Sequence, residues 1–183
     1  MTEYVIETAR VGLRPFKAED LDAFSALNDD PDVMEFFPRR LSRLECEQYM
    51  QRINEKIEAQ GYGFWAAEHL LDRQFMGFVG ITQVSYETLF TPAVEIGWRL
   101  ATRYWGRGLA TEAARACLVF GFEKAKLDRI VSFTSLVNRR SFRVMERLGM
   151  TRQGEFDHPE IPDKHVLKRH VWYALDRSGH FSG

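Results

Sequence analysis

The chain has 183 residues, of which 25 are Lys or Arg and 26 are Asp or Glu, so its formal net charge is −1. This balance excludes a protein that binds nucleic acid through bulk positive charge, and the 45% hydrophobic content excludes a disordered chain. No stretch reaches the roughly 18 consecutive apolar residues of a membrane span, and the acidic start does not match a secretory signal peptide. We therefore expect a cytoplasmic protein in which residues 1–183 form one domain.

The first half of the chain predicts two helices and four strands. Residues 11–16 alternate apolar and polar side chains like a strand, and a helix is expected over 17–27. Ser42-Arg-Leu-Glu45 is a capping-box pattern, which predicts a second helix that runs to Gly61. Aromatic and β-branched residues then predict strands at 64–69, 75–84 and 94–100.

The second half predicts two further helices with clear N-terminal signals. An apolar stripe begins at Leu109, directly after Gly106-Arg-Gly108, and Asn138 is a good N-cap for a helix that ends near Gly149. Strands are expected at 129–135, 150–156 and 169–175. Because helices interrupt a sheet, the expected class is α+β, or mixed α/β.

Cys46 and Cys117 fall on apolar faces of these predicted helices. Free cysteine in such a position usually behaves as a small buried hydrophobe, so we expect no disulfide. The sequence has no cluster of Cys and His, and we expect no metal.

Two glycines and two arginines surround the predicted helix start at Leu109. Gly106 and Gly108 can adopt positive φ, while the unpaired N–H groups and the dipole of the helix favour an anion. Arg103 and Arg107 add two positive charges, so we expect a phosphate or pyrophosphate here. The pattern lacks the ending of a P-loop and the full Gly-x-Gly-x-x-Gly of a dinucleotide fold, and glycines that serve only a tight turn are the alternative.

The motif Arg103-x-x-Gly106-x-Gly108-Leu-Ala110, preceded by Glu95-Ile-Gly-Trp98 and followed by Asn138-x-x-Ser141 and Leu148-Gly-Met150, resembles the GCN5-related N-acetyltransferases (GNAT superfamily). Segments 8–15, 30–33 and 170–175 are further similar to the ribosomal-protein N-terminal acetyltransferases of the RimJ/RimL type. The resemblance implies a GNAT-like fold, with a central mixed sheet of six to seven strands, splayed between the fourth and fifth, and about four flanking helices. It also implies transfer of an acetyl group from acetyl-CoA, as co-substrate, to a primary amine.

By this resemblance the pantetheine arm of acetyl-CoA pairs with the backbone of the fourth predicted strand, the pyrophosphate binds the glycine turn, and Asn138 hydrogen-bonds the arm. The side chains of Trp98 and Leu100 are expected in the core. Arg139, Arg143 and Arg147 form a stripe of like charge that favours an anionic partner. The 3′-phosphate or adenine end of the coenzyme is the candidate for Arg143, and Glu146 and solvent are the alternative, above all for Arg147. The expected coenzyme-binding residues are Ile96, Gly97, Trp98, Arg99, Leu100, Arg103, Trp105, Gly106, Arg107, Gly108, Leu109, Ala110, Thr111, Asn138 and Arg143.

Glu95 is the candidate general base. Acetyl transfer to nitrogen needs a neutral amine and a group that accepts its proton. Presenting a neutral amine at pH 7 costs about 4.6 kcal/mol for Lys and about 1.4 for an α-amine, so a weak, water-relayed base suffices for an N-terminus. Glu95 lies two residues before Gly97 on the coenzyme-binding strand and can face the opening; a charge pair with a neighbouring Arg is the alternative.

Ser141 is the candidate proton donor to the leaving thiolate. Many members of the resembled superfamily have Tyr seven residues after the Asn, where this chain has Met145. Ser141 resembles the serine proposed for this role in the Rim type, and a helix serine bonded to backbone is the alternative. Tyr104 and Tyr173 are further candidates.

Phe37, Trp65, Asp157 and His158 are expected on the acceptor side. Aromatic core packing and a solvated loop are the alternatives for these residues, and His158 is an alternative base. The leading acceptor is the N-terminal α-amine of a protein or peptide. The alternatives are a small amine (polyamine, amino acid or aminoglycoside) or a regulatory module that binds the coenzyme without turnover. We expect no nucleic-acid or membrane partner, and the sequence is compatible with a monomer or a homodimer.

Overall fold

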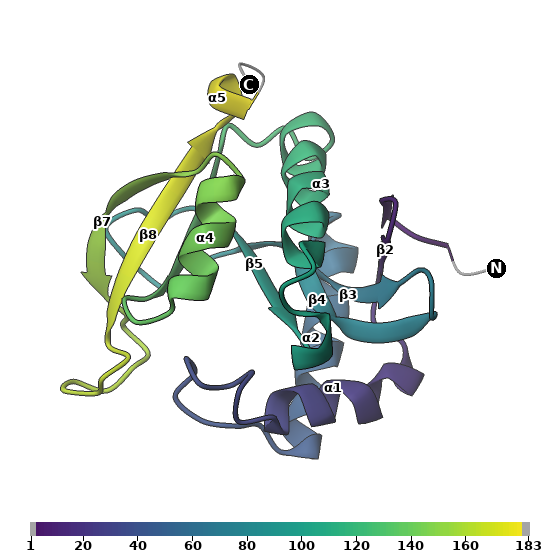
Figure 1. Ribbon diagram of the computed structural model, residues 1–183. Coiled ribbons are helices and arrows are strands. Elements are labelled where there is room, and N and C mark those ends of the chain that lie inside the picture. The colour runs from purple at the N-terminus through teal and green to yellow at the C-terminus, as the bar shows by residue number, and fades with distance from the viewer. Residues whose placement is uncertain (1–2, 181–183) are drawn as a thin grey trace.

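The computed structural model describes residues 3–180 and contains one mixed sheet flanked by four long helices (Figure 1). The strands are β1 (Ile6–Glu7), β2 (Val11–Arg14), β3 (Phe64–His69), β4 (Gln74–Gln83), β5 (Val94–Leu100), β6 (Arg129–Ser135), β7 (Thr151–Asp157) and β8 (Arg169–Asp176). The α-helices are α1 (Leu21–Asp29), α2 (Arg43–Gln60), α3 (Leu109–Glu123), α4 (Arg139–Arg147) and the short α5 (Arg177–His180). Single 3₁₀ turns at Ala18–Asp20 and Thr102–Tyr104 precede α1 and follow β5. Within this part of the chain, no helix is long and apolar enough to cross a membrane.

The sheet has eight strands in the order β1-β2-β3-β4-β5-β6-β8-β7, one more than the upper expectation from sequence. The additional strand is β1, in which Ile6 lies opposite Leu13 and Glu7 opposite Gly12 of β2. Two residues are too few to show a period of two, so the sequence pattern could not reveal this strand. The mixed α/β class is confirmed.

Local signals in the sequence account for the ends of α2. The Ser42 side chain accepts from the Glu45 N–H, and the Glu45 carboxylate accepts from the Ser42 N–H at 2.8 Å, which forms the expected capping box. Gly61 ends the helix in the left-handed region, at φ 77°. The helix therefore occupies the residues that the capping pattern indicated.

The sheet opens between β5 and β6, which are the fourth and fifth strands expected from sequence. The two strands run parallel and share a single residue pair, Glu95 opposite Val131. The Ser132 hydroxyl adds a bond of 3.0 Å to the Ile96 carbonyl oxygen. Beyond Ile96 the strands separate, and Figure 1 shows β5 diverging from the part of the sheet that carries β7 and β8. The expected splay is confirmed.

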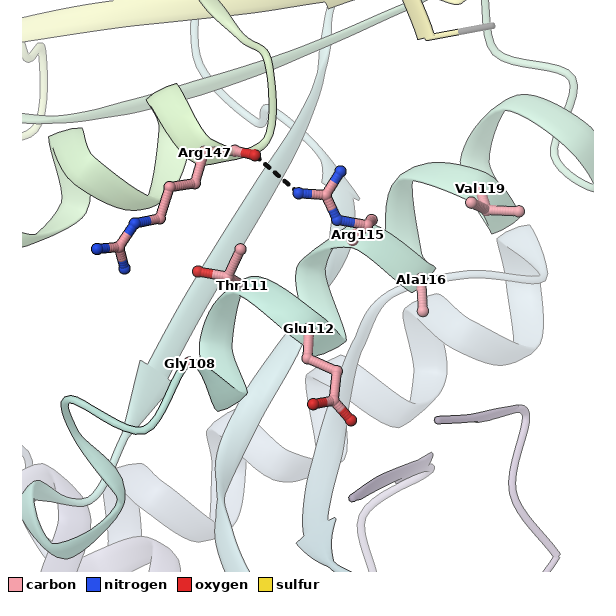
Figure 2. Close-up of a pocket in the computed structure, with 7 residues that line it drawn as sticks. All are labelled: Gly108, Thr111, Glu112, Arg115, Ala116, Val119 and Arg147. Atoms are coloured by element: carbon pink, nitrogen blue, oxygen red, sulfur yellow. Dashed lines mark hydrogen bonds between the residues drawn. The ribbon is translucent and has the colours of Figure 1, made fainter. Parts of the chain in front are cut away.

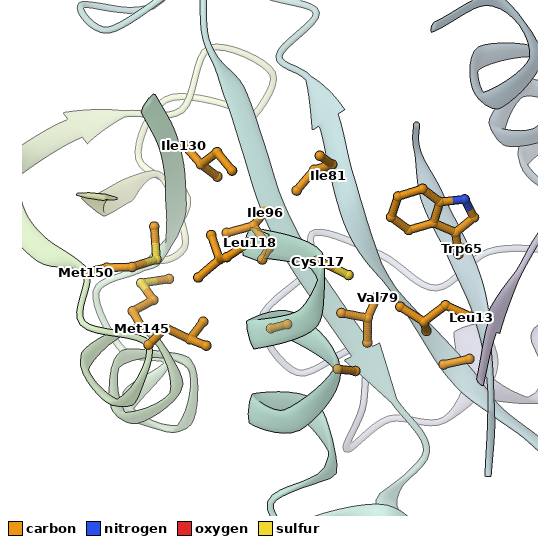
Figure 3. Close-up of a cluster of buried hydrophobic side chains, with 14 of the residues drawn as sticks. Leu13, Trp65, Val79, Ile81, Ile96, Cys117, Leu118, Ile130, Met145 and Met150 are labelled. Carbon is orange, nitrogen blue, oxygen red and sulfur yellow. The ribbon is translucent and has the colours of Figure 1, made fainter. Parts of the chain in front are cut away.

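Separate apolar clusters cover the two faces of the sheet. On one face, Ile81 and Ile96 pack against Cys117 and Leu118 of α3 (Figure 3). On the other face, α1 and α2 cover Phe78 in a second cluster that contains Cys46. Both cysteines are buried and unbonded to each other, as the sequence indicated. A third cluster, on β6, β7 and β8, contains Val131, Phe156, Trp172 and Ala174.

Candidate active site

A turn with two left-handed glycines leads into α3. Gly106 and Gly108 have φ values of 72° and 77°, and Gly108 is the N-cap of the helix. The first intrahelical bond is donated by the Glu112 N–H to the Gly108 carbonyl oxygen at 3.0 Å. The preceding N–H groups of Leu109, Ala110 and Thr111 thus have no intrahelical acceptor, and an anion is their natural partner.

Arg10, which the sequence patterns did not single out, holds this turn in place. Its Nη1 donates to the Arg107 carbonyl oxygen at 3.0 Å, and its Nε donates to Glu112 Oε2 at 2.7 Å. Thr8 Oγ1 donates to Glu112 Oε1 at 2.7 Å. Burial alone would raise the pKa of Glu112, but these bonds outweigh burial and lower it. The segment between β1 and β2 is therefore tied to the start of α3.

An open groove of about 580 Å³ runs along the outer side of α3 (Figure 2). Arg115 Nη2 donates to the Arg147 carbonyl oxygen at 2.8 Å and so joins α3 to the C-terminal end of α4. The groove is lined by Gly108, Thr111, Glu112, Arg115, Ala116, Val119 and Arg147. Arg143, the arginine expected here, is exposed and is not part of the lining, whereas Arg147 is.

The backbone of β5 offers one hydrogen-bonding unit to the opening. The Ala101 N–H donates to Met76 of β4 at 2.9 Å, whereas the Ile96 carbonyl oxygen accepts from Ser132 of β6. Because backbone groups alternate in direction along a strand, those of Trp98 point the same way as those of Ile96. Trp98 lies beyond the single residue pair with β6, so its N–H and C=O can pair with an extended, amide-bearing chain.

Glu95 lies at the narrow end of the opening, on the face of the sheet that α1 and α2 cover. Its side chain is half-buried, and burial raises its pKa to about 7, opposed by the positive charge of Lys56. A carboxyl group with this pKa can accept and release a proton near neutral pH. Gly97 follows on the same face, where an added Cβ would lie 3.2 Å from the Phe64 ring.

Arg99 is the third residue of β5 on this face, so its side chain lies on the side of the sheet that α1 and α2 cover. Its Nη1 donates to the Asn28 side-chain oxygen of α1. The guanidinium carbon lies 3.9 Å from the ring centre of Phe37 and 5.2 Å from that of Phe78. Phe37, which was expected on the acceptor side, is 38% exposed.

Asn138 and Ser141 meet at the start of α4. The Asn138 side-chain oxygen caps the helix by accepting from the Ser141 N–H at 3.3 Å. Its Nδ2 donates to Thr134 Oγ1 and to Ser141 Oγ, both at 3.0 Å. Both amide hydrogens are thus used, which leaves Asn138 one oxygen lone pair for a ligand N–H. Since Ser141 Oγ accepts from Asn138, its own proton remains free to donate.

The other hydroxyl candidates are occupied elsewhere. Tyr104 donates to Asp72 at 3.4 Å in the turn between β3 and β4, and Tyr173 donates to Glu146 at 3.5 Å. Met145 is 1% exposed and packs in the core beside α3 (Figure 3). Among the candidates named from sequence, Ser141 is the hydroxyl left available.

Among the remaining acceptor-side expectations, the one for Trp65 needs correction. Trp65 is completely buried and packs edge-on against Phe120 of α3, which leaves it no surface for a substrate. Asp157 is exposed and pairs with Arg169 at 3.3 Å on the outer strands β7 and β8. The Trp65 side chain is therefore not available to an amine beside Glu95.

His158 has a partner that no sequence pattern indicated, Tyr86 in the loop between β4 and β5. The Tyr86 hydroxyl lies 2.8 Å from His158 Nε2, and His158 Nδ1 accepts from the Glu160 N–H at 3.3 Å. Burial, together with the charge of Lys168, lowers the pKa of His158, so the ring is neutral at pH 7 and carries its proton on Nε2. His158 then donates to Tyr86, and the Tyr86 proton is free to donate. Burial, followed by the charge of Glu95, raises the pKa of Tyr86.

Comparison with known proteins identifies the family of the chain. Residues 10–151 match the model of the acetyltransferase (GNAT) domain. The chain is 32% identical over 146 residues to YkkB of Bacillus subtilis (strain 168), covering 78% of this chain and 83% of YkkB. It is 27% identical over 180 residues to the FsC-acetyl coenzyme A-N(2)-transacetylase of Aspergillus fumigatus, covering 94% and 76%.

Solved structures agree with this assignment. The acetyltransferase (GNAT family) from Bacillus anthracis has a TM-score of 0.78 and 26% identity, with 94% of this chain and 98% of that chain covered. Two structures with 18% identity share the fold. One is a spermidine N-acetyltransferase from Vibrio cholerae in complex with CoA and spermine, with a TM-score of 0.76 and with 96% of this chain and 100% of that chain covered. The other is a ribosomal-protein-S5-alanine acetyltransferase from Vibrio fischeri, with a TM-score of 0.74 and with 93% of this chain and 95% of that chain covered. With its glycine turn, open sheet and family match, the chain belongs to the GNAT family and is an acetyl-CoA-dependent N-acetyltransferase.

Proposed function

We propose that the acceptor is the N-terminal α-amine of a protein or peptide, and that Glu95 accepts its proton. The observation that carries the proposal is the pKa of about 7 for Glu95 beside the opening of the sheet. An α-amine has a pKa of about 8, only about one unit above that of Glu95, whereas a Lys side chain lies more than three units above it. Glu95 is thus matched to an α-amine at neutral pH.

In this reaction the amine nitrogen bonds to the acetyl carbonyl carbon, and the carbon–sulfur bond of the thioester breaks. Glu95 takes the amine proton through a water molecule. The Ser141 hydroxyl, whose proton is free, donates to the departing thiolate sulfur. Stabilising the leaving group in this way matters because no tyrosine occupies position 145.

The residues that would bind the coenzyme form a continuous path. The Trp98 backbone would pair with the pantetheine amides, and the remaining lone pair of Asn138 Oδ1 would accept an amide N–H. The N–H groups at the start of α3 would bind the pyrophosphate, with Arg103 and Arg107 as exposed cations nearby. The groove with Arg115 and Arg147 would take the 3′-phosphate end, a role for which Arg143 is less well placed.

A small amine is the second candidate acceptor. A relative with 24% identity over 151 residues is the spermidine N(1)-acetyltransferase of Escherichia coli, so sequence similarity extends to an enzyme with a polyamine in its name. The two acceptors differ in what they require of the site, because a polyamine needs several anionic groups and a peptide needs one base. The cation Lys56 acts on Glu95, and Arg99 follows on the same face of β5, which favours the peptide.

The proposal is tested by release of free thiol from acetyl-CoA with peptides of varied N-terminus and, in parallel, with spermidine and spermine. We expect turnover with peptides that have a free N-terminus and none with the same peptides blocked by N-terminal acetylation. Two peptides that each contain a single internal Lys, one with a free and one with a blocked N-terminus, distinguish acetyl transfer to the α-amine from transfer to the Lys side chain. Turnover with polyamines alone would reject the peptide acceptor.

A further inference from the structure

Arg99 is a cation on the acceptor face that has no anionic partner. It belongs to no ion pair within residues 3–180, and its side chain hydrogen-bonds to the neutral amide of Asn28. The titratable groups that face it are Tyr49 and Cys46, and burial raises the pKa of both, so both are uncharged at pH 7. The guanidinium charge is therefore uncompensated.

Its hydrogen bonding is also incomplete. Nε of Arg99 is buried and has no hydrogen-bond partner. The rings of Phe37 and Phe78 offset part of the cost of burying the charge through cation–π contacts. Such contacts lie over the plane of the guanidinium and do not provide an acceptor for its N–H groups. A planar group with two free donors is suited to a carboxylate, which can accept from both.

The place of Arg99 relates it to the reacting amine. Glu95 and Arg99 occupy the same face of β5, with Gly97 between them providing no side chain to separate them. Four residues of extended strand put the Cα atoms of Glu95 and Arg99 about 13 Å apart. Because both side chains are long, their charged ends can lie closer together than this. An anionic group within about three residues of the amine can therefore reach Arg99.

We propose that Arg99 binds a carboxylate of the acceptor, so that the enzyme prefers an amine with an acidic group close to it. This inference rests on the proposed function, because the role of Glu95 as the base is what places the amine on the same face of β5 as Arg99. The carboxylate can come from an Asp or Glu side chain near a peptide N-terminus or from the α-carboxylate of a free amino acid. A polyamine would instead bring positive charge to Arg99.

The first experiment compares peptides that differ by one carboxylate. Pairs with Asp or Asn, and with Glu or Gln, at positions 1, 2 and 3 are assayed by thiol release with the full-length protein and saturating acetyl-CoA. We expect kcat/KM to be at least tenfold higher for the acidic member at one or more of these positions, through a lower KM. Free amino acids, each against its α-carboxamide, and free aspartate and glutamate, against asparagine and glutamine, form the small-molecule arm.

Two substitutions connect any preference to Arg99. Arg99→Met is expected to bring the acid-to-amide ratio close to one, and Arg99→Lys to retain part of it. Arg52→Met, an equal loss of charge at an exposed position of α2 that also lies near an aromatic ring, should keep the native ratio. Circular dichroism and coenzyme affinity verify the fold of each variant.

A binding measurement makes the result independent of turnover. Calorimetric titration of the CoA-bound protein with N-acetylated peptides should show tighter binding of the acidic members, and loss of this difference in Arg99→Met. Preference for acidic free amino acids alone would reject the peptide acceptor and retain the role of Arg99. Equal affinities and equal kcat/KM for acid and amide in the native protein, or a preference that survives in Arg99→Met, would overturn it.

Discussion

Arg10 Nη1 donates to the carbonyl oxygen of Arg107 at 3.0 Å, although 97 residues separate the two in the chain. This bond fixes one peptide unit of the turn between Gly106 and Gly108, and Arg10 is itself held by Glu112. The conformation of the glycine turn therefore depends on a segment that lies far from it in sequence.

Removal of this bond should weaken coenzyme binding. In Arg10→Ala we expect the Kd for CoA, measured by calorimetry, to rise about three- to tenfold, because a partly exposed charged hydrogen bond contributes about 1 kcal/mol. Arg129→Ala, which removes an exposed arginine paired with Asp176 on the outer part of the sheet, serves as the control and should leave Kd unchanged. Equal Kd values in both variants would contradict the role of Arg10.

The effect of the left-handed Gly106 on coenzyme binding can be separated from its effect on stability. Gly106 and Gly61 both adopt φ above 70°, and an added Cβ meets no atom within 4 Å at either position. Alanine at each should therefore lower the free energy of unfolding by a similar amount, about 1 to 2 kcal/mol, through backbone strain. Gly106→Ala alone should raise the KM for acetyl-CoA. A similar KM increase in Gly61→Ala would show that lost stability, and not the turn, is responsible.

The pKa of Glu95 predicts the pH dependence of turnover. A general base must be deprotonated, so kcat/KM for the peptide should rise with pH through about 7 and continue to rise as the α-amine deprotonates near 8. Glu95→Gln should remove the lower limb and reduce kcat about 10²-fold. Retention of the limb near pH 7 in this variant would assign the base to another group, with His158 the first to test.

Ser141 should affect turnover more than coenzyme binding. In Ser141→Ala the donor to the thiolate is lost, and we expect kcat to fall about tenfold or more while the Kd for CoA changes little. Ser85→Ala, at an exposed position before Tyr86, is the matched control. The comparison should be repeated with an acyl donor whose thiol is a better leaving group, for which the effect of Ser141→Ala should shrink. An unchanged kcat in Ser141→Ala would leave Ser141 a helix-capping residue.

His170 should make the fold sensitive to acid. It is 6% exposed, and burial, together with nearby His158, lowers its pKa to about 4 from the ordinary 6.5. The unfolded chain therefore binds the proton first, so stability is lost as pH falls from 6.5 to 4, by about 3 kcal/mol at most. Chemical denaturation between pH 7 and 4 should show a smaller loss for His170→Asn. Parallel pH curves for the two proteins would contradict this assignment.

Local patterns predicted the parts of the site that depend on a few neighbouring residues. The capping box at Ser42, the start of α3 after Gly108 and the N-cap at Asn138 lie where the sequence indicated. These features are determined by backbone groups within one helical turn, which is why one stretch of sequence is enough to predict them.

Contacts between distant segments could not be predicted in the same way. The sequence suggested Trp65 for the acceptor side, but it packs against Phe120. The contacts of the Arg99 side chain with Phe37 and Phe78 likewise join segments that lie far apart in the chain. The pairing of Tyr86 with His158 could not be predicted, because the two residues are 72 positions apart in the chain. Composition and spacing do not show on which face of a sheet a side chain is covered.

The sequence by itself determined the family, the glycine turn, the helix ends and the strand that carries Glu95, because these follow from local backbone chemistry and short motifs. Only the tertiary structure decided the surroundings of Glu95, the bond between Arg10 and the turn, and the absence of an ion pair to Arg99 within the described residues. Burial and charge pairing depend on which distant segments the sheet brings together, and that arrangement sets both the pKa of the proposed base and the charge of the proposed acceptor site.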